Sequence, residues 1–115
     1  MIAHVILFSP RTGLSQAARR DLLDALVAAS DGIPSIRRFR VGRRVHHGLP
    51  GYEQMMQDDY EFAAIIEFDD LDGLKAYLSH QSHRAIGQHF TASASRSLAY
   101  DYAMADAGDV GQLLE

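Results

Sequence analysis

The chain has 115 residues, a formal net charge of −4 and no cysteine, and 47% of its residues are hydrophobic. This length suits one domain with a real core, the mildly acidic balance argues against nucleic acid as a partner, and the lack of cysteine excludes disulfides and thiolate ligands. No apolar run is long enough for a secretory signal or a membrane span, so we expect a cytoplasmic protein that does not bind membranes.

Residues 2–8 predict a short strand that is apolar on both faces. His4 is the one polar side chain within it. A helix is expected to begin after Ser15, a good N-cap, and to end near Gly32 in a left-handed glycine cap, because Pro34 forbids its continuation.

Two further strands are expected at 36–45 and 60–68. In the first, Phe and Val alternate with Arg, which predicts an edge strand or a strand with one solvent-exposed face. The second is apolar on both faces apart from Glu61 near its start and Glu67. The connection 46–59 is long for a compact domain, and its apolar side chains predict that it folds over a pocket mouth or clasps a partner subunit.

The second half of the chain predicts a helix over 71–78, a break near His80, a second short helix over 82–90 and a last strand over 97–104. The resulting order β-α-β-β-α-β is the ferredoxin-like arrangement, an α+β fold with a four-stranded antiparallel sheet and helices on one face only.

In a monomer, the helix-free face of such a sheet should be polar. Strands 2–8 and 60–68 are instead apolar on both faces, and a second copy of the sheet is the simplest cover. We therefore expect a homodimer whose two sheets face each other. The domain is expected over 1–104, followed by a loosely ordered C-terminal tail over 105–115.

Four stretches form a recognisable set: HVILF in the first strand, YEFAAIIEFDDLDGLKAYL through the third strand and the next helix, HQSH after it, and SLAYDY near the end. Together they span nearly the whole chain, which with them resembles the stress-responsive A/B barrel (Dabb) family of dimeric α+β barrel proteins. The resemblance implies the same ferredoxin-like fold, with two sheets facing each other in a homodimeric α+β barrel.

Some members of that family are polyketide cyclases, whereas others resemble plant stress-induced proteins that assemble into large particles. The cyclases use a Tyr and a His from a Tyr-x-x-His-Pro-x-His stretch, with a further His at the start of the first strand. The resemblance implies that these residues are Tyr77, His83 and His4. Gln81 stands where the family prefers Pro, which lowers the rigidity of the turn before His83 without removing the chemistry.

The residue pattern by itself also directs these three side chains inward. His83 shares a helical face with apolar residues that follow it at helical spacing, and Tyr77 lies on the apolar face of the preceding helix. His4 shares a strand face with apolar neighbours. Three polar groups would converge on an apolar pocket that suits a hydrophobic small molecule. The expected pocket walls are Ile6, Phe8, Leu22, Leu26, Phe62, Ala64, Ile66, Ile86, Phe90 and Ala99.

Two functions remain open from the sequence. In the first, His83 is the general base on a C–H flanked by carbonyls, Tyr77 donates a hydrogen bond to the oxygen that gains enolate charge, and His4 holds or relays the proton. The reaction would be an aldol- or Claisen-type cyclisation, a related lyase reaction or an isomerisation, without metal or organic cofactor. In the second, the chain is a non-catalytic stress-responsive binding or assembly protein, and any single inward histidine is an ordinary core residue bonded to the backbone.

Three other interpretations have less support. A haem-degrading monooxygenase of the same barrel architecture is disfavoured because the chain has no Trp. His46 and His47 do not predict a metal site with His4, since neighbouring strand residues point apart and no carboxylate follows at ligand spacing. The stretch IRRFRVGRR predicts a solvated or dimer-edge strand, in which Arg43 is placed to steer an anionic substrate.

Overall fold

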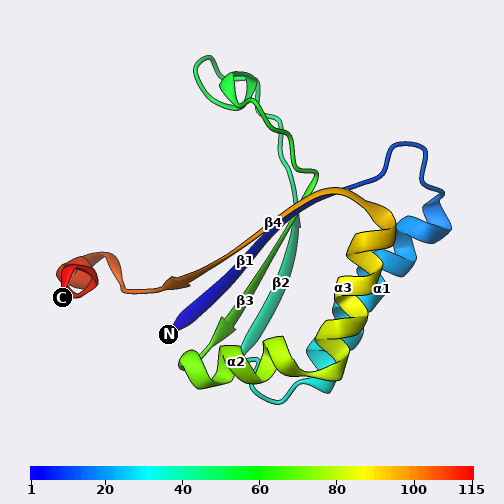
Figure 1. Ribbon diagram of the computed structural model, residues 1–115. Coiled ribbons are helices and arrows are strands. Elements are labelled where there is room, and N and C mark those ends of the chain that lie inside the picture. The colour runs from blue at the N-terminus through cyan, green and yellow to red at the C-terminus, as the bar shows by residue number, and fades with distance from the viewer.

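A four-stranded antiparallel sheet with helices on one side forms the body of the chain, whose structure is a computed structural model describing residues 1–115 (Figure 1). The elements are β1 Ile2–Pro10, α1 Gln16–Gly32, β2 Arg38–Arg43, η1 Glu53–Met55, β3 Phe62–Phe68, α2 Leu71–Ser79, α3 Gln81–Ser93, β4 Ala94–Ala103 and η2 Ala107–Leu114. The strand order β2-β3-β1-β4 is that of a ferredoxin-like unit whose second helical part is divided in two. The predicted fold is therefore confirmed.

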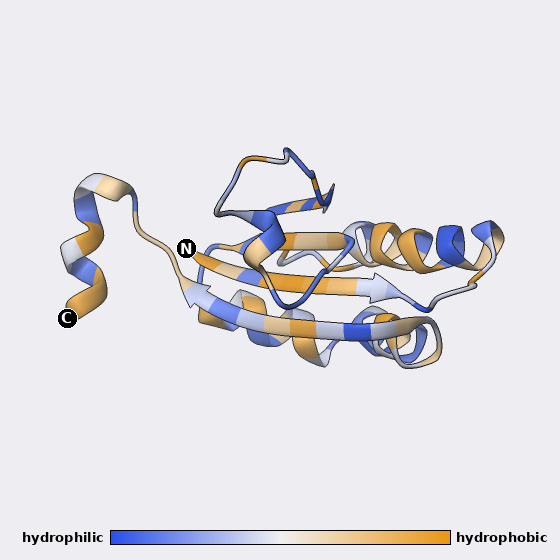
Figure 2. Ribbon diagram, turned by 90° about the horizontal axis from the view of Figure 1, so that it is seen from above, coloured by the Kyte–Doolittle hydropathy of each residue, from blue (hydrophilic) through white to orange (hydrophobic).

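The strand register decides which side chains share a face of the sheet. In β1, His4 is paired with Ile66 of β3 on one side and with Asp101 of β4 on the other. Since directly paired residues point to the same face, all three lie toward the helices. Val5 and Leu7 point to the opposite face, and Figure 2 shows that β1, which starts beside the N label, is hydrophobic along most of its length.

Side chains cap the helices at the positions that local sequence favours. The Ser15 hydroxyl accepts a backbone hydrogen bond at the start of α1, and Asp70 does the same for α2. His80 ends α2 and caps α3, its Nδ1 accepting from the backbone N–H of Ser82 at 3.1 Å. The predicted left-handed cap at Gly32 is wrong, because this residue stays within α1 without a positive φ and the chain continues in extended conformation.

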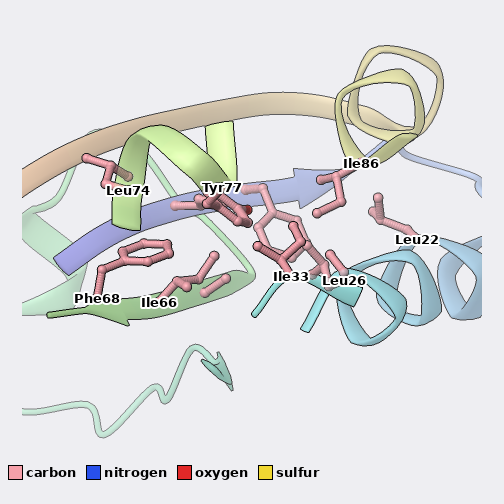
Figure 3. Packing of buried hydrophobic residues seen from close by; sticks show 12 residues of the cluster. Leu22, Leu26, Ile33, Ile66, Phe68, Leu74, Tyr77 and Ile86 are labelled. Atoms are coloured by element: carbon pink, nitrogen blue, oxygen red, sulfur yellow. The ribbon is translucent and has the colours of Figure 1, made fainter. Parts of the chain in front are cut away.

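The core lies between the sheet and the helices and is a cluster of 12 buried residues (Figure 3). They are Ile6, Phe8, Leu22, Leu26, Ala29, Ile33, Ala64, Ile66, Phe68, Leu74, Tyr77 and Ile86. Alternate residues of β1 and β3 supply one wall, and helical stripes at spacings of three and four supply the other. Tyr77 is fully enclosed within this cluster, with 0% of its surface exposed.

The helix-free face of the sheet is mainly apolar over β1 and β4, carries Arg38, Arg40 and Glu67 toward its β2 edge, and is not covered by any helix of the chain. Its larger apolar side chains are Val5, Leu7, Ile65, Leu98, Tyr100 and Tyr102. On β4, Tyr100 and Tyr102 are 57% and 51% exposed. Val5, Leu7 and Ile65 are half-buried between their strand neighbours, and an apolar face of this extent without a covering helix is typical of an interaction surface.

Residues 46–59 form an arm that projects from the end of the sheet opposite α2 (Figure 1). Glu53 holds the arm together, since its carboxylate accepts backbone hydrogen bonds from His47 at 2.8 Å and from Gly48 at 2.6 Å. Gly48 and Gly51 turn the chain with positive φ angles that favour glycine. The arm does not cover the region around Tyr77, and its contact with a partner subunit stays a prediction.

The η2 segment, which falls in the predicted tail, forms 3-10 turns that extend away from the body of the chain (Figures 1 and 2). Val110, Leu113 and Leu114 are 54%, 52% and 90% exposed on it. None of the helices in the structure has the length and apolar character that crossing a membrane requires.

Candidate active site

Four polar or aromatic side chains meet where β1, β4, α2 and α3 come together. The ring of Tyr77 lies between two histidine rings, with centroids 5.5 Å from His4 and 4.8 Å from His83, both edge to face. Nδ1 of His4 lies 2.5 Å from Oδ1 of Asp101. The three residues implied by the family resemblance thus lie beside one another, together with an aspartate that sequence reasoning missed.

Local structure explains this convergence. Asp70 starts α2, so Leu74 and Tyr77 fall on the helical face that packs on the sheet. The chain turns at His80 before α3 begins, which brings His83 in the first turn of α3 back toward Tyr77. Figure 3 shows Tyr77 entering the core from α2, beside Phe68, which lies 5.3 Å away between ring centroids.

The Tyr77 hydroxyl is buried without a hydrogen-bond partner in the protein. Burial raises the pKa of this phenol to about 12, and the negative charge of Asp101 adds to the shift. Tyr77 therefore stays protonated at neutral pH and can only act as a neutral donor or acceptor. Since almost all buried polar atoms are paired, this orphan hydroxyl needs an explanation.

The hydrogen bond between His4 and Asp101 fixes the orientation of the His4 ring. Only 3% of His4 is exposed, whereas the Asp101 side chain on the edge strand is 41% exposed. An ionised carboxylate only accepts hydrogen bonds, so Nδ1 of His4 carries the hydrogen that it donates to Asp101. The alternation of β4 carried a signal for Asp101, because it lies two residues after Ala99, which was expected to face the helices.

His83 is half-buried, and its pKa is lowered from 6.5. Burial is the main cause, the neighbouring His4 adds to it, and a backbone hydrogen bond with Leu78 acts in the opposite direction. The ring is therefore neutral at pH 7, with a nitrogen lone pair available to take a proton.

The expected wall residues pack against one another. All except Phe62, Phe90 and Ala99 belong to the buried core cluster, and Phe8 contacts Phe62 and Phe90 at centroid distances of 5.4 and 4.9 Å. Ala99 is exposed on β4, opposite Ile6.

Several hollows lie on the surface of the chain. His83 lines an open one along α3 with Arg84, Gly87 and Thr91, but neither Tyr77 nor His4 lines any of the more pronounced ones. Arg43 lies beside the arm, at the end of the sheet remote from His83. No group of three or more His, Cys, Asp or Glu residues is placed to hold a metal ion.

The comparisons with known proteins agree with this architecture. A dimeric ferredoxin-like protein of unknown function from Thermobifida fusca has a TM-score of 0.70 and 22% identity, over 90% of each chain. A Dabb family protein from Mesorhizobium loti has a TM-score of 0.71 and 19% identity, over 91% of this chain and 97% of that chain. Hydroxynitrile lyase from Passiflora edulis has a TM-score of 0.79 and 10% identity, over 92% and 94%. The comparison with curated protein sequences gave no match.

These similarities and the sheet topology place the chain among ferredoxin-like α+β proteins. The model of the stress-responsive A/B barrel domain (Dabb) family matches residues 2–104. The chain belongs to this family, as its sequence motifs predict.

Proposed function

We propose that this Dabb protein is a cofactor-independent acid–base enzyme that makes or breaks a carbon–carbon bond next to a carbonyl group, as in a cyclase or a lyase. The observation that carries the proposal is the buried Tyr77 hydroxyl, which has no partner although it lies beside two histidines. An unpaired donor is what a carbonyl oxygen that gains negative charge requires.

Each group has a separate role in the proposed reaction. His83, neutral at pH 7, removes the proton and later returns it. Tyr77, held in its protonated form, donates a hydrogen bond to the substrate oxygen as charge develops there. His4 accepts a hydrogen bond or relays the proton through Nε2, and Asp101 is a positioning residue that fixes its ring.

Access to this site requires a movement of side chains. Tyr77 is 0% exposed, and the hollow lined by His83 lies outside the core. A substrate that enters along α3 would meet His83 first and Tyr77 behind it. Opening of the short segment around His80, where α2 ends and α3 begins, would admit it without unfolding the sheet.

We propose further that the protein works as a homodimer with its two helix-free faces in contact. The uncovered apolar residues of β1, β3 and β4 support this arrangement. The Thermobifida fusca relative, a dimeric protein, supports it by analogy of fold. A hydrophobic small molecule is the ligand class that the apolar surroundings of Tyr77 favour.

A second function, non-catalytic binding or assembly, is favoured by a different observation. The predicted pocket walls fill the space around Tyr77, as in an ordinary core. In that case the two histidines and Asp101 only stabilise the fold, and the exposed apolar faces are the functional part of the molecule.

One assay separates these functions. Mandelonitrile and the aldol adduct of benzaldehyde and acetone both release benzaldehyde when a base removes the hydroxyl proton and the carbon–carbon bond breaks. The departing electron pair and a proton give hydrogen cyanide in the first case and acetone in the second. We expect benzaldehyde release above the buffer rate from at least one of them.

Substitutions assign the roles in this assay. His83→Ala should lower the rate about 10²–10⁴-fold, the usual contribution of a general base, and Tyr77→Phe should lower it less. The control is His46→Ala, in the exposed arm. Equal rates for wild type and His83→Ala, or no release above buffer, would favour the binding or assembly protein.

A further inference from the structure

The structure contains a groove that the proposed active site does not use. It lies between the arm and the helix-free face of the sheet and has a volume of about 810 Å³. Its apolar lining consists of Leu7, Met55, Met56, Tyr60, Phe62 and Ala63. Met55 and Met56 are 70% and 62% exposed. Flexible apolar side chains of this kind are common at protein contact surfaces, where they adapt to the partner.

Positive charge predominates at the border of this groove, because its one acidic lining residue, Asp58, is paired with Arg96 at 2.5 Å. Arg43 lines it and forms no ion pair with any carboxylate of the chain. Arg44, which also lines the groove, is held by Asp59 at 2.6 Å. The groove therefore suits a segment that is apolar on one side and carries a free carboxylate.

The η2 segment has this composition. Val110, Leu113 and Leu114 are its exposed apolar residues. Asp109 within it and Glu115 directly after it are acidic and form no ion pair within the chain. The sheet and helices of the same chain do not bury these apolar residues, because η2 extends away from the sheet (Figure 1).

No chain can place η2 in its own groove. The arm and η2 lie at opposite ends of the sheet, and the seven residues of β3 alone span about 23 Å between these ends (Figure 1). When two sheets meet face to face with their strands running in opposite directions, the η2 end of one copy lies at the arm end of the other. A two-fold axis then creates two equivalent contacts at once.

We infer that, in the homodimer, the η2 segment of each copy docks into the arm groove of its partner. Leu113 and its apolar neighbours contact Met55 and Met56, and an η2 carboxylate pairs with Arg43 of the other copy. This inference rests on the proposed sheet-to-sheet dimer. The docking would bury the apolar side chains of the arm and of η2, which a contact between the two sheets alone would leave exposed.

Cysteine cross-linking tests the contact directly, because the natural chain has no cysteine. We expect the double variant Met56→Cys/Leu113→Cys to form, on mild oxidation, a disulfide-linked dimer on a non-reducing gel. Neither single variant should do so, since equivalent residues of the two copies lie apart. The matched control is Val27→Cys/Leu113→Cys, because Val27 on α1 is 56% exposed, close to the 62% of Met56.

The outcomes separate the docking from the dimer itself. The docking alone is overturned if the wild type sediments as a dimer but the double variant does not form the expected cross-link. That outcome includes no cross-link, a cross-link within one chain, or a cross-link no more efficient than in the Val27→Cys/Leu113→Cys control. A wild type that sediments as a monomer would overturn the dimer and the docking together.

A second measurement does not depend on disulfide geometry. Leu113→Asp should raise the dissociation constant of the dimer about tenfold or more, because it places a charge in an apolar contact. Gln112→Asp adds the same charge one residue away and should change it little. Equal effects of the two substitutions would contradict docking through Leu113.

Discussion

At Tyr77, a hydroxyl group without a partner is enclosed by side chains that otherwise form an ordinary core. Phenylalanine keeps the ring and removes the unpaired group, so we expect Tyr77→Phe to raise the free energy of unfolding by about 1 kcal/mol. Urea unfolding followed by circular dichroism measures this change. A more stable but slower variant is the signature of a functional hydroxyl, whereas a loss of stability would mean that the hydroxyl is paired in solution.

His83 predicts a pH dependence of stability. Its pKa in the folded chain is lowered from 6.5, so the unfolded chain takes up the proton first as the pH falls. The contribution of the neutral His83 ring to the free energy of unfolding is complete above about pH 6.5, the ordinary pKa of the unfolded chain. It is lost as the pH falls toward and through the lower pKa of the folded chain.

An NMR titration should therefore give His83 a midpoint below 6.5, and His83→Gln should show a smaller fall in stability on acidification than the wild type. His46→Gln, in the exposed arm, serves as the control. A midpoint at or above 6.5 would show that the ring is accessible and not desolvated.

Among the elements, the joint between α2 and α3 depends on one residue. His80 caps α3 through Nδ1, so we expect His80→Ala to lower the free energy of unfolding by about 1 kcal/mol. Asn, a strong N-cap residue, should restore most of the loss in His80→Asn. Thermal or urea unfolding of His80→Ala and His80→Asn tests the capping role. If both variants lose the same free energy of unfolding, His80 does not stabilise the chain as an N-cap. The specific activity of folded His80→Ala should change little.

Local signals predicted the elements well where neighbouring residues decide the structure. Ser15 starts α1 and His80 marks the break between α2 and α3, as expected. The ends of strands were less predictable, since pairing with other strands sets them. β2 is shorter than the expected 36–45, and β4 begins before the expected 97, at Ala94.

The same distinction applies to the candidate site. Tyr77 and His83 were identifiable because helical spacing and a family motif both mark them. The alternation of β4 could mark Asp101 only as a helix-facing residue. Its link to His4 was not predictable, because it depends on the register of two strands that are far apart in the sequence. The filled core around Tyr77 was also unpredictable, since composition and spacing do not reveal whether large side chains leave a space.

For the whole molecule, the uncovered sheet face is the decisive feature. We expect Val5→Asp to abolish the dimer, and with it cooperative folding, because a buried charge in this face would have no partner. Val27→Asp is the matched control, since Val27 is exposed on α1. Light scattering and thermal unfolding check both. A wild type that is a stable monomer at micromolar concentration would contradict the prediction.

Strand β4 carries two sets of side chains that alternate along its length. Ala99 and Asp101 are paired with Ile6 and His4 on the helix side, whereas Tyr100 lies opposite Val5 on the uncovered face. Because the period is two, inserting or deleting one residue early in β4 would exchange the two sets. The aspartate would enter the face that we propose to contact the partner subunit, and a tyrosine would face His4. Substitutions in this strand can therefore change one face at a time, but a change in its length would disrupt the proposed site and the proposed dimer contact in one step.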